Sequence, residues 1–230
     1  MKKQQIWGRA AACITDSRGF NCGTGAGSEQ YVVADRQIAA QVKEELIRHG
    51  AYFMTETEQK QLTAFLGLEK GTGLPDKEFI GKTAAWLAQK AGFAVPEHTK
   101  VLVSEQSYIT DFNPYAKGLL CPVLAFYIEE DWIHACENVL SFWWRKPGQY
   151  VYHSFAGSGS HSAVCLKKPV GRVLINTPAV WGAMGVTTDL FPTVILGSVT
   201  SKEGITAENV SPLHMIYRRK AAFGIHGLCS

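Results

Sequence analysis

The chain has 230 residues, of which 46% are hydrophobic and 19% are charged, a composition that excludes a disordered chain. This length fits one large domain or two small ones. The 23 basic and 20 acidic side chains leave a formal net charge of +3, too small and too dispersed to indicate a nucleic-acid partner.

Strands and helices are predicted in alternation along the chain. A short apolar strand at 31–33 precedes 37–49, where apolar residues recur at helical spacing up to Gly50. Thr55 stands three residues before Glu58, a capping-box pattern that predicts a second helix through residue 66. The other predicted elements are a helix at 77–91, buried strands at 101–103, 123–127 and 172–176, a helix at 131–142, and a last strand at 214–218. The alternation indicates an α/β sheet with crossover helices and a C-terminal edge strand.

The N-terminal residues, the apolar runs and the cysteines indicate where in the cell the protein is expected. The first residues are basic, but no apolar segment typical of a signal peptide follows them, and no run of 18 apolar residues could span a membrane. Six cysteines occur without a C-x-x-C pair, which favours free thiols and no metal site. A cytoplasmic protein without a membrane partner is therefore expected.

Several stretches carry a resemblance to one enzyme family. The run R-V-L-I-N-T-P-A-V-W-G-A-M-G at 172–185 resembles the signature strand and loop of CoA-acylating aldehyde dehydrogenases. F-N-C-G-T-G-A-G-S-E-Q at 20–30 is similar to their nucleophile loop, and C-P-V-L-A-F-Y at 121–127 is similar to one of their strands. Shorter stretches at 188–192, 208–212 and 218–224 continue the match. The resemblance implies the fold of the family's catalytic domain.

The resemblance also implies a division of the chain. Residues 1–19 are an N-terminal lead-in, 20–224 resemble the thiol-bearing catalytic domain, and 225–230 are a tail. Family proteins are about twice as long and have an N-terminal, Rossmann-like domain that binds NAD. This sequence contains no G-x-G-x-x-G pattern between a strand and a helix, so the NAD-binding domain is expected to be absent from it.

The family reaction needs a cysteine thiolate, which attacks an aldehyde, loses hydride to NAD and passes the resulting thioester to CoA. Alignment without a gap from Phe20 to Gln30 places Ala26 at the nucleophile position, and a methyl group cannot do this chemistry. Cys22 is the only thiol in the loop. It is either a small buried hydrophobic residue, the favoured interpretation, or a weak substitute nucleophile that glycine-permitted movement of the loop would bring into place.

Outside the nucleophile loop, the sequence differs from the family pattern at two places and agrees with it at a third. Gly118 stands where the family has a glutamate that accepts a hydrogen bond from the nicotinamide ribose. The segment 143–164 is atypical, through local degeneration or a shifted reading frame, although a strand at 150–154 is expected within it. Asn176, Thr177 and Pro178 match the loop beside the acyl pocket, where they shape the substrate site or serve structure alone.

The resemblance implies an oxidoreductase that converts aldehyde, CoA and NAD into acyl-CoA and NADH, with NAD and CoA as cofactors. The loss of the thiol at Ala26 predicts that this chain alone is inactive. Two alternatives stay open: a non-catalytic assembly domain, or a half-enzyme completed by a separate NAD-binding chain with Cys22 as nucleophile. A homo-oligomer or the complementary chain would pair through the C-terminal edge strand. Many relatives sit in bacterial microcompartments, so this location is a further expectation.

Overall fold

A parallel four-stranded sheet forms the centre of the computed structural model, which describes residues 2–25, 27–68, 77–107, 115, 119–131, 133–134, 150–153, 172–192 and 211–216. The strand order is β1 (Tyr31–Asp35), β4 (Val123–Glu129), β3 (Val101–Gln106) and β2 (Ala51–Phe53). All neighbouring strands run parallel. The central strands β3 and β4 are almost wholly buried, as their continuous apolar runs predict.

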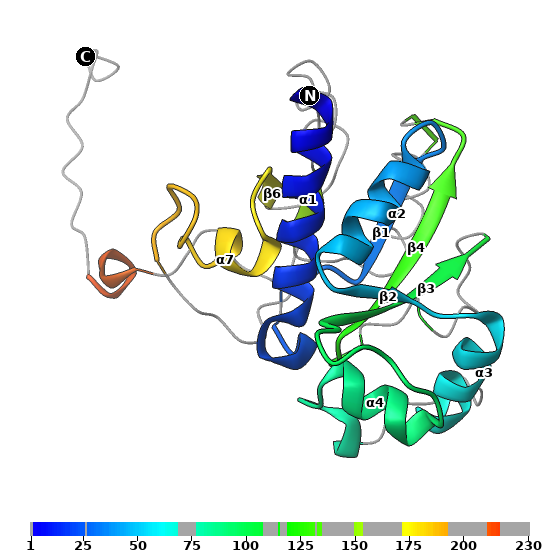
Figure 1. Ribbon diagram of the computed structural model, residues 1–230. Helices are drawn as coiled ribbons and strands as arrows, with labels where there is room; N and C mark the ends of the chain where they lie inside the picture. The colour runs from blue at the N-terminus through cyan, green and yellow to red at the C-terminus, as the bar shows by residue number, and fades with distance from the viewer. Residues whose placement is uncertain are drawn as a thin grey trace, which may run out of the picture.

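Helices cover both faces of this sheet (Figure 1). On one face, α1 (Lys2–Gly19) and α2 (Ala39–Arg48) pack on alternate strand residues such as Leu124 and Phe126. On the other face, α3 (Glu56–Phe65) and α4 (Ala84–Ala91) pack on the intervening residues, including Leu102 and Val123. Because successive side chains of a strand point to opposite faces, the apolar runs fill two separate cores.

The helix α1 is an element that the sequence did not predict, since 1–19 reads as a lead-in. Ala11 and Ile14 are buried at helical spacing against the sheet, but most of the other buried positions of α1 are alanine or polar. Thr15 is fully buried, and its hydroxyl donates to the Ala11 carbonyl at 2.9 Å. The apolar stripe is therefore too weak to stand out in the sequence. No helix within the described ranges is both long and apolar enough to cross a membrane.

The capping box predicted for α3 is confirmed, whereas two shorter helices replace the helix predicted at 77–91. The Thr55 hydroxyl accepts from the Glu58 N–H, and the Glu58 carboxylate accepts in return from the Thr55 N–H, which completes the capping box. In place of one helix at 77–91 there is a 3-10 helix at Lys77–Phe79 followed by α4. Gly81 has φ +75° and Thr83 caps the Trp86 N–H, so a turn separates the two. The three-residue strand β2 was not predicted.

A second, two-stranded parallel sheet joins β5 (Tyr150–His153) to β6 (Arg172–Ile175), and α7 (Ala179–Ala183) follows it. The prediction of an edge strand at 214–218 is wrong for its first residues, because Pro212–Met215 form a 3-10 helix. Pro212 has no N–H for a strand ladder, and the Ser211 hydroxyl accepts from the Leu213 N–H. Ala26, Gly118, residues 217–218, the segments 143–149 and 154–164, and nearly all of the predicted helix at 131–142 lie outside the described residues.

Candidate active site

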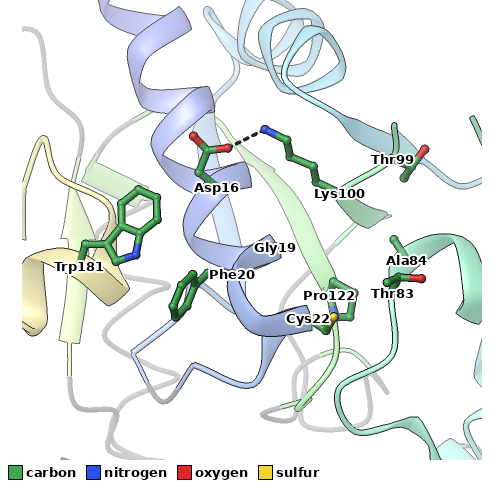
Figure 2. Close-up of a pocket in the computed structure, with 10 residues that line it drawn as sticks. All are labelled: Asp16, Gly19, Phe20, Cys22, Thr83, Ala84, Thr99, Lys100, Pro122 and Trp181. Atoms are coloured by element: carbon green, nitrogen blue, oxygen red, sulfur yellow. Dashed lines mark hydrogen bonds and ion pairs between the residues drawn. The ribbon is translucent and has the colours of Figure 1, made fainter. Parts of the chain in front are cut away.

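The loop 20–30 lies at the amino-terminal edge of the main sheet, beside a cavity of about 470 Å³. Strands β3 and β4 begin directly after two residues of the cavity wall, Lys100 and Pro122. Figure 2 shows Trp181 of α7 on one side of the end of α1, and Thr83 and Ala84 on the other. The lining residues are Asp16, Gly19, Phe20, Cys22, Thr83, Ala84, Thr99, Lys100, Pro122 and Trp181.

Cys22 lines this cavity and is half-buried. Its φ of 54° and that of Asn21, 47°, place both residues in the left-handed region, which residues other than glycine seldom adopt. The turn is held locally, because the Asn21 amide donates to the Thr24 hydroxyl at 2.8 Å and that hydroxyl donates to the Asn21 carbonyl. Cys22 thus lines the cavity in the loop conformation that the structure describes.

The glycines of the loop permit close approach to its neighbours. A Cβ on Gly23, where φ is +75°, would lie 2.4 Å from the Cys121 carbonyl carbon, and a Cβ on Gly25 would lie 2.9 Å from Val180 Cγ2. Atoms at these distances overlap, so side chains are excluded at both positions. Gly23 and Gly25 are therefore tightly packed against Cys121 and Val180.

Arg18, the penultimate residue of α1, is the largest fully buried side chain among the residues that the structure describes. Its Nε donates to the Val123 carbonyl at 3.0 Å, and its Nη2 donates to the carbonyls of Leu119 and Cys121 at 2.8 and 2.6 Å. Its Nη1 donates to the Ser28 hydroxyl at 2.9 Å. Burial lowers the pKa of Arg18 to about 10, against the opposing effects of Cys121 and Glu29. The guanidinium thereby ties the end of α1 and loop 20–30 to the start of β4.

Each side chain of the S-E-Q run at 28–30 forms a hydrogen bond with a residue outside loop 20–30. Ser28 accepts from Arg18, and Gln30 Oε1 accepts from the Leu119 N–H at 3.3 Å. Glu29 Oε1 accepts from the Ala179 N–H, in the first turn of α7, at 3.0 Å. This matched motif therefore joins the loop to α1, to Leu119 shortly before β4, and to α7.

Glu29 is itself buried. Its carboxylate has a hydrogen bond with the Ser17 side chain, whose oxygen accepts from the Val180 N–H at 3.1 Å. Burial raises the pKa of Glu29 to about 7, although these hydrogen bonds and the charge of Arg18 oppose the rise. Its second oxygen, Oε2, is buried and has no hydrogen-bond partner among the described residues.

Asn176, Thr177 and Pro178 lie between β6 and α7, and they do not line the cavity of the described structure themselves. Asn176 has φ +53°, and the buried Thr177 hydroxyl is hydrogen-bonded to that of Thr187. The three residues set the direction of α7, whose Trp181 does line the cavity. The ring of Trp181 meets that of Phe20 edge-on, with centroids 6.0 Å apart.

The cysteines of the described structure differ in their suitability for chemistry. Cys121 is buried, and desolvation raises the pKa of its thiol to about 11, so it is unreactive near neutral pH. Cys22 is more accessible and faces the cavity. Among the residues that the structure describes, no three His, Cys, Asp or Glu side chains could hold a metal ion together.

Sequence reasoning missed Ser17, Arg18 and Trp181. Trp181 lies inside the matched run at 172–185, and its position there is the one signal that could have indicated it. Ser17 and Arg18 directly precede the matched loop, but a polar residue at a helix end usually reads as exposed. Their roles follow from contacts with residues more than 100 positions away, which no local pattern encodes.

Comparisons with known proteins agree with the fold. A probable aldehyde dehydrogenase from Listeria monocytogenes EGD-e has 32% sequence identity and a TM-score of 0.87, with 96% of this chain and 49% of that one covered. An acetylating aldehyde dehydrogenase from Geobacillus thermoglucosidasius has 28% identity and a TM-score of 0.86, with 97% and 49% covered. The bifunctional aldehyde-alcohol dehydrogenase AdhE of Escherichia coli K12 is 29% identical over 231 residues, 93% of this chain and 24% of that protein. No family model matches the chain.

The fold and the similar structures define an α/β protein of the aldehyde dehydrogenase type. The chain is homologous to the CoA-acylating aldehyde dehydrogenases, as the three matched motifs imply. It spans about half the length of the two solved relatives and about a quarter of AdhE.

Proposed function

We propose that this chain is the thiol-domain part of a CoA-acylating aldehyde dehydrogenase system and that, with Ala26 at the nucleophile position, it forms no acyl-enzyme of its own. The observation that supports the site is the convergence of the matched segments, since loop 20–30, the start of β4 and α7 meet beside one cavity. The observation that argues against acylation is the methyl group at residue 26, which can neither attack a carbonyl nor hold a thioester.

A second candidate function uses Cys22 as the nucleophile. It is favoured by the position of Cys22 in the cavity wall, within a held turn. In acyl transfer the Cys22 thiolate would attack the carbonyl carbon of an acyl-CoA. The bond from that carbon to the CoA sulfur would break, and CoA would leave as a thiolate that takes up the proton that Cys22 had lost. The product is a thioester on the protein, and no electrons are transferred, so this half-reaction needs no NAD.

The described residues do not fit NAD. The family uses NAD(P) and CoA, and a dinucleotide needs backbone N–H groups at a glycine-rich turn for its phosphates. The cavity offers one lysine, Lys100, whose Nζ is already 2.7 Å from Asp16 Oδ1. We therefore derive no step through NAD from these residues, and aldehyde oxidation in this proposal uses NAD that a complementary domain or chain binds. CoA enters as a substrate whose sulfur must reach loop 20–30.

The test is incubation of the full chain with acetyl-CoA, followed by intact mass and peptide mapping, with hydroxylamine lability as the mark of a thioester. Four proteins are compared: the native chain, Cys22→Ser, Ala26→Cys, and the double variant. We expect no adduct on the native chain or on Cys22→Ser. A hydroxylamine-labile acetyl group is expected on residue 26 in both proteins that carry Ala26→Cys, because the surrounding anchors stay in place.

Each other outcome has a definite meaning. An adduct on the native chain that Cys22→Ser abolishes would overturn the proposal in favour of Cys22. No adduct on any variant would contradict the claim that loop 20–30 presents residue 26 to an acyl donor. The native chain mixed with acetaldehyde, CoA and NAD is expected to form no NADH, and NADH production by it would also refute the proposal.

Assembly of the chain with a second copy or with a complementary NAD-binding chain is part of the proposal. The 3-10 helix at Pro212–Met215 takes the place of the first part of the strand at 214–218 that was expected to mediate this pairing. Sedimentation of the chain with and without a candidate partner measures this association.

A further inference from the structure

The carboxyl group of Glu29 lies at the meeting point of three segments. Glu29 itself belongs to loop 20–30, Ser17 comes from α1, and Ala179 and Val180 form the first turn of α7. Oε1 accepts from the Ala179 N–H, and the Ser17 side chain links the same carboxyl group to the Val180 N–H. One carboxyl group thus holds the loop against α7.

The two oxygens of this carboxyl group have different environments. Oε1 has donors, whereas Oε2 is buried without a hydrogen-bond partner within the described residues. A buried carboxylate oxygen without a donor destabilises the ionised form, because water no longer solvates it. Arg18 attracts the negative charge from nearby, but all three of its nitrogens donate to other acceptors, Ser28 and three backbone carbonyls. The charge of Arg18 therefore offsets only part of the destabilisation that burial imposes on ionised Glu29.

We propose that Glu29 is a proton-controlled latch: its neutral carboxyl group holds loop 20–30 on the first turn of α7, and its ionisation loosens this contact. The contact carries the Phe20 and Trp181 rings that line the cavity, so its loosening would open the cavity wall. This device depends on the packing of the loop and not on which residue acts as nucleophile.

The charged and titratable surroundings support a transition near neutral pH. Burial raises the pKa of Glu29 to about 7, and Arg18 on α1 is the one described residue whose charge acts on it, in the opposite direction. Cys121, before β4, faces Arg18, and its pKa is raised to about 11, so it stays neutral in this range. The residues of α7, Ala179–Ala183, include no titratable side chain.

The test is hydrogen exchange of the Ala179 and Val180 amides between pH 6 and pH 8, corrected for the intrinsic exchange rate. If opening exposes a carboxyl group with an ordinary pKa, the protection of these amides should fall by about tenfold over this interval. In Glu29→Gln, which keeps an acceptor at Oε1 but cannot ionise, protection should not change with pH. The matched control is Glu45→Gln, a buried glutamate on α2 whose carboxylate pairs with Arg48, and this variant should retain the native pH dependence.

An internal comparison keeps the inference testable if Glu29→Gln does not fold. Within the native chain, the fully buried Leu102 amide donates to the Pro122 carbonyl between β3 and β4 and serves as a reporter of global unfolding. Because the latch opens locally, the corrected protection of the α7 amides should lie well below that of Leu102 at every pH while it falls about tenfold. Equal protection at both places would mean that the α7 amides exchange only through global unfolding and would overturn the latch, as would pH-independent protection of α7. The measurement contains no aldehyde or CoA, so its result is independent of the acylation experiment.

Discussion

Replacement of Arg18 by methionine removes the side chain that joins α1, loop 20–30 and the start of β4. The change leaves four buried acceptors without their donor: the Ser28 hydroxyl and the carbonyls of Leu119, Cys121 and Val123. Each unsatisfied buried group costs about 1–3 kcal/mol. The variant also regains roughly 3 kcal/mol, because the pKa of Arg18 is lowered from 12.5 to about 10 and each pKa unit corresponds to about 1.4 kcal/mol. Together these two effects give an expected net loss in the free energy of unfolding of about 1–9 kcal/mol, with a central value near 5 kcal/mol.

Urea unfolding followed by circular dichroism measures this loss. The matched control is Arg36→Met, which removes an exposed arginine and should change stability by less than about 0.5 kcal/mol. If Arg18→Met does not fold, Arg18→Lys keeps the charge but loses the planar fork, and we expect it to fall between the native chain and the methionine variant. A loss below about 1 kcal/mol for Arg18→Met would refute the reasoning, because the four hydrogen bonds would then contribute almost nothing to folding.

Three other predictions follow from the same region. Burial raises the pKa of Glu29 from its ordinary 4.5 to about 7, so the folded chain binds this proton more tightly than the unfolded chain does. The free energy of unfolding should therefore fall by about 3 kcal/mol as pH rises from below 4.5 to above 7. Urea titrations across pH 5–8 capture most of this fall, and Glu29→Gln should lack it; parallel profiles would contradict the assignment. Gly23→Ala should cost more than about 2 kcal/mol, because its Cβ would overlap the Cys121 backbone, whereas Gly67→Ala, also at positive φ but with open space around it, should cost about 1 kcal/mol in the same assay. Iodoacetamide at pH 8 should label Cys22 in the folded chain and Cys121 only after unfolding, as peptide mapping reports; equal labelling of the two would refute the contrast in burial.

The sequence predicted the elements whose signals are local. Continuous apolar runs indicated β3 and β4 because both faces of those strands are buried, and the capping box at Thr55 and Glu58 marked the start of α3. The motif match also singled out the stretch at 20–30, in which Ser28 and Glu29 form long-range hydrogen bonds in the structure. These successes depend on information that lies within a few residues of each element.

The sequence did not predict the features that depend on long-range contacts. Helix α1 has few large apolar residues, and its buried Arg18 forms hydrogen bonds with partners about 100 positions away. The cavity position of Cys22 results from two residues in the left-handed region, which no residue type at 21 or 22 demands. The expected strand at 214–218 has apolar residues at suitable spacing, but Pro212 and the Ser211 hydroxyl favour a helical turn there.

The site separates the groups that hold the loop from the position that would react. The side-chain anchors come from Arg18 before the reactive stretch and from Ser28, Glu29 and Gln30 after it, so none uses a side chain at residues 25–27. Introduction of a thiol at residue 26 therefore tests whether this position can be acylated. A change at Arg18 tests how far the anchoring of loop 20–30 matters. If the anchoring by Arg18 controls the reactivity of residue 26, adding Arg18→Lys to Ala26→Cys should slow acetylation by acetyl-CoA at least tenfold under conditions where the protein stays folded. The reason is that a loop displaced by about an ångström loses its alignment with the acyl donor. An unchanged acetylation rate would restrict the role of Arg18 to stability.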